Sequence, residues 1–139
     1  MVPPEQALPK YFPLDAGVKF DCEKSDLLAI KWKAESLSAD FLLPDAERHA
    51  LRVYFNGATI VRLLDEMPLS TEQGPTKNEG LIPRHFAYRV EGSTFGDTQS
   101  KAWKTIHHPV RQYEFITGWG CMDVLSGAEP TFEVVDISE

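Results

Sequence analysis

Cysteine is almost absent from this chain. Only Cys22 and Cys121 occur among its 139 residues, and neither belongs to a Cys-x-x-Cys pair. Paired cysteines at that spacing are a usual sign of a zinc site, so their absence argues against that class of metal protein. We expect both thiols to be reduced and mostly buried, as in a cytosolic protein, whereas export would leave a disulfide between them open.

Basic residues and long apolar runs are also scarce. The chain has 14 Lys and Arg against 21 Asp and Glu, a formal net charge of -7. Nucleic-acid binding requires grouped basic residues, and here they are scattered, so we predict no nucleic-acid partner. No apolar run approaches the roughly 20 residues that span a bilayer, and residues 1–10 have neither the basic start nor the apolar core of a signal peptide. We therefore expect a cytoplasmic protein with no membrane partner.

Motifs for cofactors, metals and nucleophiles are missing. Neither Gly-x-x-x-x-Gly-Lys nor Gly-x-Gly-x-x-Gly occurs, which excludes two common phosphate-binding loops. The serine of Gly92-Ser-Thr-Phe-Gly96 is in the wrong position for a nucleophile elbow. The adjacent His107 and His108 would point to opposite faces of an extended segment, so they cannot easily share a metal. We predict no metal and no cofactor.

Short alternating segments are what the sequence contains instead. Apolar residues recur at every second position in 28–34, 37–43, 85–91, 113–117, 121–125 and 131–137. With two further runs in 51–66 they make about eight strands at near-regular spacing, without recurring helices between them. The sequence therefore predicts a mainly β, single-domain protein over 1–139, an antiparallel β-sandwich or partly open barrel with at most one short helix.

The alternation also predicts which side chains face the core. The inward residues of three strands are Leu28, Ile30 and Trp32; Leu37, Ala39, Phe41 and Leu43; and Phe86, Tyr88 and Val90. We also place Trp103 in the core.

The clearest local signal is an Asn-Gly pair between two alternating runs. Asn56 and Gly57 are the residues that best tolerate the positive φ of a type I′ turn. We therefore predict a β-hairpin over 51–66, in which the two-residue turn sets the register and Phe55 pairs with Ala58.

Three segments fall outside the strand pattern. Residues 1–13 contain four prolines and predict an extended arm without regular structure. Residues 67–84 are rich in Pro, Gly and polar residues and form the longest predicted loop, which is either functional or disordered. Asp97 is the expected N-cap of a short helix that runs through Trp103.

Four residues are our candidates for a binding site. Trp119 lies between Gly118 and Gly120 at a predicted strand end, and an exposed tryptophan there is a frequent interaction hot spot. His85 and Arg89 share the predicted non-core face of one strand, and Asp123 lies beside the turn. The alternative for Trp119 is that its ring folds back over the core.

Three short motifs carry a resemblance to known proteins. Leu51-Arg-Val-Tyr-Phe-Asn-Gly57, Arg111-Gln-Tyr-Glu-Phe-Ile-Thr117 and Asp123-Val-Leu-Ser126 resemble segments of small uncharacterised bacterial β-rich proteins, some of them grouped with toxin-immunity proteins. The resemblance implies a noncatalytic cytoplasmic binding domain. An acidic domain of this kind would suit a partner with a basic surface, because opposite charge raises the association rate. The resemblance does not identify any functional residue in this chain.

Three classes of function remain open. An interaction domain predicts an exposed apolar or acidic patch near Trp119 or the 67–84 loop. A small-ligand binder predicts a pocket with a few convergent polar groups. An enzyme predicts a histidine near a carboxylate inside such a pocket, although no carboxylate spacing in the sequence singles out an acid and a base.

Overall fold

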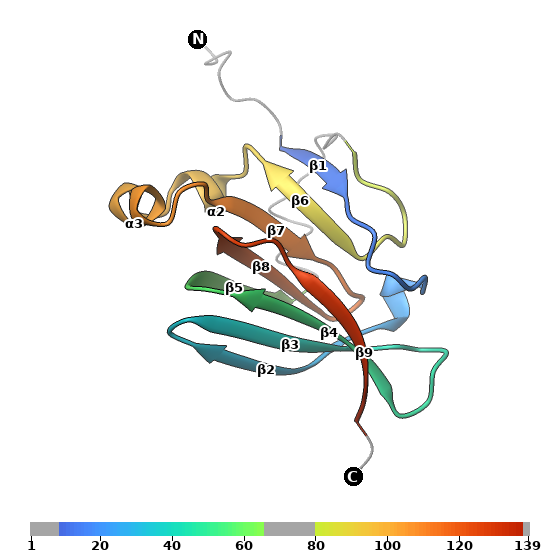
Figure 1. Ribbon diagram of the computed structural model, residues 1–139. Coiled ribbons are helices and arrows are strands. Elements are labelled where there is room, and N and C mark those ends of the chain that lie inside the picture. Colours follow the sequence, from blue (N-terminus) through green and yellow to red (C-terminus); the bar gives the residue numbers. More distant parts are fainter. Residues whose placement is uncertain (1–8, 66–79, 138–139) are drawn as a thin grey trace.

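The computed structural model describes residues 9–65 and 80–137, which form nine strands in two antiparallel sheets (Figure 1). The first sheet has the strand order β1-β6-β7-β8-β5, and the second has the order β2-β3-β4-β9. One apolar cluster contains residues from both sheets, so the sheets pack face to face. The fold is an antiparallel β-sandwich without a closed barrel, which confirms the predicted class.

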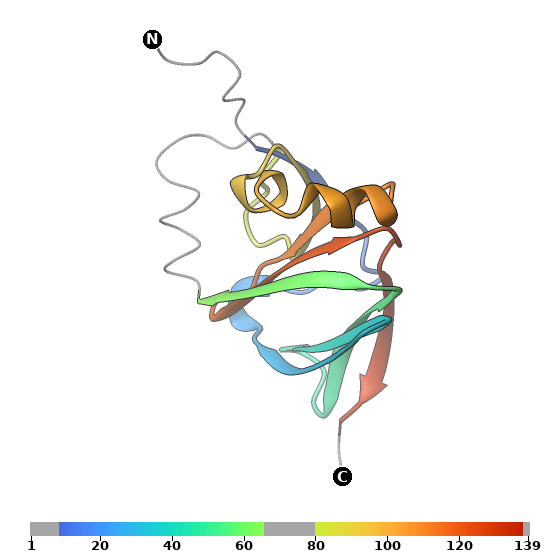
Figure 2. The ribbon, with the colours of Figure 1, turned by 90° about the vertical axis from the view of Figure 1, so that its left-hand side faces the viewer.

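The strands follow the predicted segments closely. Those of the five-stranded sheet are β1 (Lys10–Pro13), β6 (Ala87–Glu91), β7 (Arg111–Phe115), β8 (Gly120–Ser126) and β5 (Thr59–Asp65). Those of the four-stranded sheet are β2 (Leu27–Lys33), β3 (Ser36–Leu42), β4 (His49–Asn56) and β9 (Thr131–Asp136). A 3-10 turn, η1 (Cys22–Lys24), precedes β2. Helices α2 (Thr94–Asp97) and α3 (Lys101–Ile106) lie beyond the five-stranded sheet, away from the other sheet (Figure 2).

Aromatic rings from both sheets fill the space between them. Phe115 of β7 is 0% exposed, and its ring lies within 6.4 Å, centre to centre, of four other phenylalanine rings. The four predicted inward residues of 37–43 are all buried, which confirms the alternation of β3. The strand is covered because β2 and β4 flank it and the five-stranded sheet lies over its inner face.

The Asn-Gly hairpin prediction is wrong. β4 pairs with β3 and β9, whereas β5 pairs with β8 of the other sheet, so Phe55 does not pair with Ala58. Gly57 has φ +129°, but among the described non-glycine residues only Arg48 and Arg84 have positive φ, so Asn56 cannot form a type I′ turn. Residues of β4 and β5 reach one core from opposite sheets, an arrangement that satisfies the same alternation without direct pairing.

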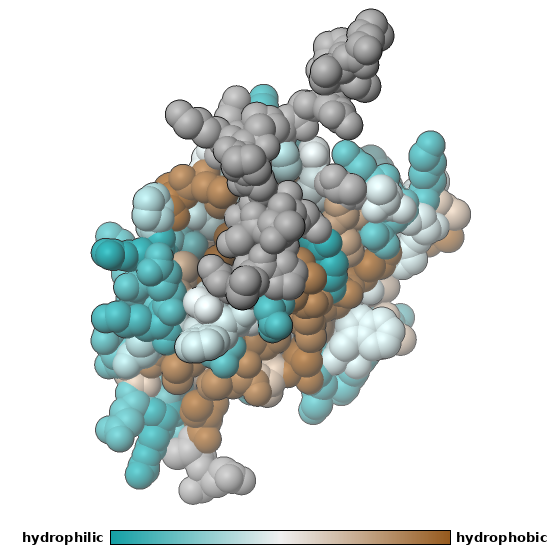
Figure 3. All heavy atoms as spheres, turned by 180° about the vertical axis from the view of Figure 1, so that it is seen from behind, coloured by the Kyte–Doolittle hydropathy of each residue, from teal (hydrophilic) through white to brown (hydrophobic). Residues whose placement is uncertain are grey.

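The predicted burial of one face of β2 is also wrong. Leu28, Ile30 and Trp32 are exposed, Trp32 to 61%. β2 is an edge strand of its sheet, so its apolar side chains are covered from one side only, and the Trp32 Nε1 donates a hydrogen bond to Thr59 Oγ1 at 3.2 Å. Seen from behind, the molecule carries a band of apolar surface between hydrophilic areas (Figure 3).

Strand β6 is buried on both faces, not on one. Ala87 belongs to the main core between the sheets, while Tyr88 and Val90 pack with Tyr11 of β1 in a second, smaller cluster. The prediction that Phe86, Tyr88 and Val90 are buried is confirmed. Trp103, expected in the core, is half-buried on α3.

Three local predictions need correction. Residues 10–13 of the predicted arm form β1, which pairs with β6 and thereby acquires backbone hydrogen bonds. Asp97 ends α2 and is not a cap: Ser100 caps α3, where its Oγ accepts from the Trp103 N–H at 3.1 Å. There are two short helices in the described chain, not one. Most of the predicted 67–84 loop, and residues 1–8 of the arm, lie outside the described residues.

Both cysteines are free and buried, which confirms the expectation of two reduced thiols. The Cys22 Sγ donates to His85 O at 3.4 Å, and the Cys121 Sγ lies 3.7 Å from Thr117 O. Burial, assisted by the nearby Asp21, raises the pKa of the Cys22 thiol to about 11. Burial likewise raises the pKa of Cys121 to about 12.

The raised thiol pKa values predict a loss of stability in alkali. The unfolded thiols, with an ordinary pKa of 9.0, release their protons first, so the free energy of unfolding is unaffected below about pH 9 and falls as the pH rises toward 11 and 12. The raised pKa values of buried Tyr88 and Tyr113 act in the same direction. Urea unfolding between pH 7 and 11 measures the decline. Cys121→Ala should show a smaller decline than the parent; an equal decline would contradict the assignment to the thiols.

Candidate functional site

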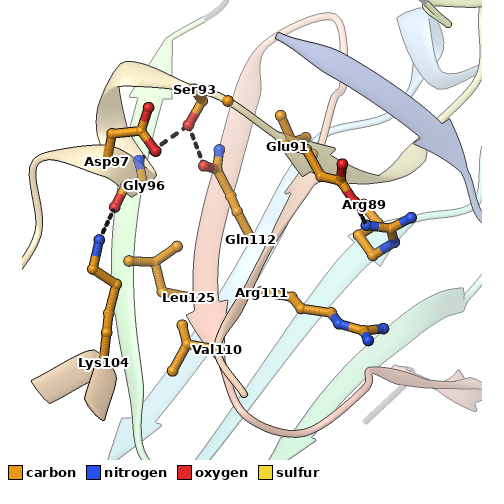
Figure 4. A pocket seen from close by; sticks show the side chains of 12 residues that line it. Arg89, Glu91, Ser93, Gly96, Asp97, Lys104, Val110, Arg111, Gln112 and Leu125 are labelled. Atoms are coloured by element: carbon orange, nitrogen blue, oxygen red, sulfur yellow. Dashed lines mark hydrogen bonds and ion pairs between the residues drawn. The ribbon is translucent and has the colours of Figure 1, made fainter. Parts of the chain in front are cut away.

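A polar pocket of about 400 Å³ lies between the end of β6, the two helices and the start of β7 (Figure 4). Its charged lining residues are Arg89, Glu91, Asp97, Lys104 and Arg111. Two buried polar residues, Ser93 and Gln112, lie at its inner side. The pocket therefore has the concave shape and polar groups that a small-ligand site requires.

The buried polar groups of this pocket bind one another. The Ser93 hydroxyl donates to Gln112 Oε1, and the Gln112 amide donates to Asp123 Oδ1 at 3.3 Å. Arg62 donates from Nε (3.1 Å) and Nη2 (2.7 Å) to Asp123 Oδ2, and its guanidinium carbon lies 4.5 Å from the centre of the Phe95 ring. This chain of contacts crosses the outer face of β7, β8 and β5, where it ties together three neighbouring strands.

Three of the five charged residues around the pocket also have partners. The Lys104 Nζ donates to Gly96 O at 2.8 Å, and Arg89 forms an ion pair with Glu91. The guanidinium of Arg111 is turned away from Ser93 and Lys104 (Figure 4). Among the described residues that line the pocket there is no histidine or cysteine. The Ser93 hydroxyl is already engaged: it donates to Gln112 Oε1 and accepts from the Gly96 N–H at 3.0 Å. The arrangement suits a structural network better than acid–base chemistry.

The four residues predicted from the sequence do not form one site. Asp123 faces outward from β8 but is 2% exposed beneath its partners. Arg89 lies on the opposite face of the sheet, because it pairs with Tyr113, which pairs with Val124. His85 precedes β6 and donates from Nε2 to Leu14 O at 3.1 Å when that nitrogen carries the proton. In the described part of the chain, no hydrogen bond or ion pair joins any two of the four predicted residues, Trp119 included.

Trp119 is held outward at the turn between β7 and β8. Its side chain is 70% exposed, the second-highest value among the large apolar residues of the described chain. The Trp119 N–H donates to Thr117 Oγ1 at 3.1 Å, and the Gly118 N–H donates to Cys22 O at 3.0 Å. A Cβ at Gly118 would lie 2.0 Å from Glu23 O, so only glycine allows this contact between the turn and η1. The indole is therefore displayed by a pinned backbone.

A shallow hollow of about 330 Å³ adjoins this turn. Its lining residues are Asp26, Leu27, Leu63, Leu64, Asp65, Gly120 and Cys121. Asp65 pairs with Gly120 across β5 and β8, and a Cβ at Gly120 would lie 3.4 Å from Asp26 Oδ1. Glu23 adds a third carboxylate on η1, while the exposed Lys24 contributes one positive charge.

We call this region, Trp119 with Glu23, Asp26, Leu63 and Asp65, the Trp119 surface. Sequence reasoning identified Trp119 from its flanking glycines but missed Asp26. It did not single out Asp65 either, because no carboxylate spacing in the sequence distinguishes that residue. No local pattern could have found the group, because Asp26 precedes β2 of one sheet and Asp65 ends β5 of the other.

Comparison with protein-family models, with curated proteins and with solved structures gives no match. Within residues 9–65 and 80–137, no group of three or more His, Cys, Asp or Glu side chains could hold a metal ion. Across the same residues, no helix has the length and apolar character needed to cross a membrane.

Proposed function

We propose that this protein is a noncatalytic cytoplasmic protein-interaction domain, with immunity-like inhibition as one form of that function, and that the Trp119 surface binds a protein with a basic surface. The observation that carries the proposal is the 70% exposure of Trp119 on a backbone pinned by hydrogen bonds. A rigid, exposed indole loses little conformational entropy on binding and buries a large apolar area, which is why tryptophan is enriched among interface hot spots.

The carboxylates that line the hollow next to the Trp119 turn support a basic partner. A lysine or arginine from the partner could lay its aliphatic stem against Leu63 and bring its charged group to Asp26 or Asp65. An adjacent cation can also interact with the face of the indole. The net charge of -7 acts over a longer range and would accelerate association with a positively charged protein.

Trp119→Ala tests the proposal, because the chain offers a matched control. We expect it to weaken binding of the partner at least about 30-fold, the loss of a hot-spot residue worth about 2 kcal/mol, without unfolding the domain. Trp32→Ala removes a second exposed tryptophan, 61% exposed on β2, and should leave the affinity within about twofold. Asp65→Asn should lower mainly the association rate and reduce its dependence on salt.

The partner for these measurements is obtained by photocrosslinking in cells. A benzoylphenylalanine at position 119, and separately at position 32, is crosslinked, and the captured protein is then purified for titration calorimetry. The proposal requires a protein captured from position 119 but not from position 32, with a basic surface. Equal capture from both positions, or a Trp119→Ala variant that unfolds, would refute it.

A further inference from the structure

A second, apolar pocket of about 510 Å³ lies at the end of the sandwich, between loop 14–20 and segment 82–87. Its apolar walls include Leu14, Val18, Phe20, Ile82, Pro83 and Phe86. Leu14, Val18 and Phe20 are partly buried and pack against the main core, while Phe86 belongs to it. The pocket has the size and apolar lining typical of small-molecule sites.

Hydrogen bonds hold the two walls together. The Leu14 N–H donates to Ala87 O at 2.9 Å, and the ring of His85 contacts Leu14 O through Nε2 at 3.1 Å. The Phe20 and Phe86 rings lie 5.1 Å apart, centre to centre. These contacts join the loop to the start of β6, so the pocket is formed before any ligand arrives and binding needs little reorganisation.

The rim of this pocket is basic, in contrast to the acidic chain. Lys19, Arg84 and His85 line it, and Asp15 is its single acidic lining residue among the described residues. Asp15 Oδ1 already accepts from the Gly17 N–H at 2.7 Å. Arg84 is 69% exposed, and its Nε lies 3.8 Å from Asp21 Oδ2, beyond hydrogen-bond distance. Its guanidinium can therefore donate to another anion.

We propose that this pocket binds a small apolar carboxylate, with its hydrocarbon part against Val18, Phe20 and Phe86 and its carboxylate at Arg84 and Lys19. The apolar walls disfavour a highly charged or strongly hydrated ligand, because they offer no partner for its polar groups. The guanidinium fork matches the planar geometry of a carboxylate, so the rim favours an acid over a neutral molecule of the same shape. This site is separate from the Trp119 surface, and either can hold without the other.

Octanoate and 1-octanol are the two probes, because they share a hydrocarbon chain and differ in charge. Titration of the full chain is followed by heteronuclear NMR and calorimetry. We expect octanoate to shift the amide signals of 14–20 and 82–87 and to bind about tenfold more tightly than 1-octanol. Equal affinity for the two probes, no binding of octanoate at millimolar concentration, or shifts confined to other residues would overturn the proposal.

Arg84→Asn is the decisive variant. Arg84 has φ +66°, a left-handed conformation that asparagine tolerates better than most residues, so the substitution removes the charge with little backbone strain. We expect it to lower the octanoate affinity about tenfold and to leave 1-octanol binding unchanged. Arg48→Asn is the matched control, since Arg48 has φ 63° and does not line the pocket.

Lys19→Gln provides a second test that does not depend on whether the Arg84→Asn variant folds. Lys19 is exposed in loop 14–20, so its replacement should leave the fold intact. We expect a smaller but measurable loss of octanoate affinity. Unchanged octanoate binding by both the Arg84 and the Lys19 variants would show that the basic rim does not recognise the carboxylate.

Discussion

Replacing Phe115 with alanine should lower the free energy of unfolding by about 3–5 kcal/mol, the largest effect we expect from a single substitution in this chain. Phe115 is 0% exposed on the central strand of the five-stranded sheet. Its ring contacts rings from both sheets, with centre-to-centre distances of 6.1 Å to Phe41, 6.1 Å to Phe55 and 5.5 Å to Phe86. The variant therefore loses both the buried apolar area of one ring and the packing of its neighbours. Equilibrium urea unfolding measures the loss.

Phe12→Ala is the matched control for Phe115. Phe12 lies on the edge strand β1, is 37% exposed and contacts the Arg89 guanidinium at 4.2 Å from its ring centre. The same atoms are removed, but little new cavity forms, so we expect a loss of about 1 kcal/mol or less. Similar losses from the two substitutions would contradict the assignment of Phe115 to the centre of the core.

Arg62→Met should cost about 3 kcal/mol, because it leaves the Asp123 carboxylate buried without its cation. The Asp123 side chain is 2% exposed, and that of Arg62 is 24% exposed. Only the Gln112 amide, at 3.3 Å, would then remain as a described donor to the carboxylate. Water reaches part of Arg62, so the loss should lie at the lower end of the range for buried pairs. Urea unfolding again provides the measurement.

A second arginine–aspartate pair provides the comparison. Arg52 donates to both carboxylate oxygens of Asp40, at 2.8 and 2.9 Å, on the four-stranded sheet. The Arg52 side chain is 41% exposed, and solvent screens this pair, so Arg52→Met should cost about 1 kcal/mol or less. If both variants lost the same stability, burial would not be the reason for the importance of Arg62.

The double variant Arg62→Met, Asp123→Asn separates the lost charge from the lost packing. If the penalty comes from an unpaired buried carboxylate, the neutral amide should restore part of the stability of Arg62→Met. No recovery would indicate that the effect is carried by other contacts of Arg62, among them its contact with the Phe95 ring. Because both oxygens of Asp123 accept hydrogen bonds within the fold, we assign this residue to stability and leave it outside the Trp119 surface.

Strand formation was predictable because alternation is a local property. Every strand predicted from 28–34 to 131–137 is present, and the inward residues of β3 are buried as expected. The same alternation failed for β2, since an edge strand has no neighbour on one side and its inward residues stay exposed. Asn56-Gly57 satisfied a turn rule, yet the chain crosses there from one sheet to the other. Pairing depends on distant strands that a short segment does not encode.

The sequence by itself determined that this chain is a mainly β, antiparallel protein, because periodicity, short turns and composition suffice for that. It left the choice between a sandwich and a partly open barrel, and the pairing of the two cysteines, to the structure. It also singled out Trp119, since two glycines flank a large ring. Only the tertiary structure decided which side chains lie next to the turn that carries it. Asp26 and Asp65 line one hollow next to that turn because β2 and β5 lie in different sheets that pack together. A surface assembled from both sheets exists only after the core between them has formed.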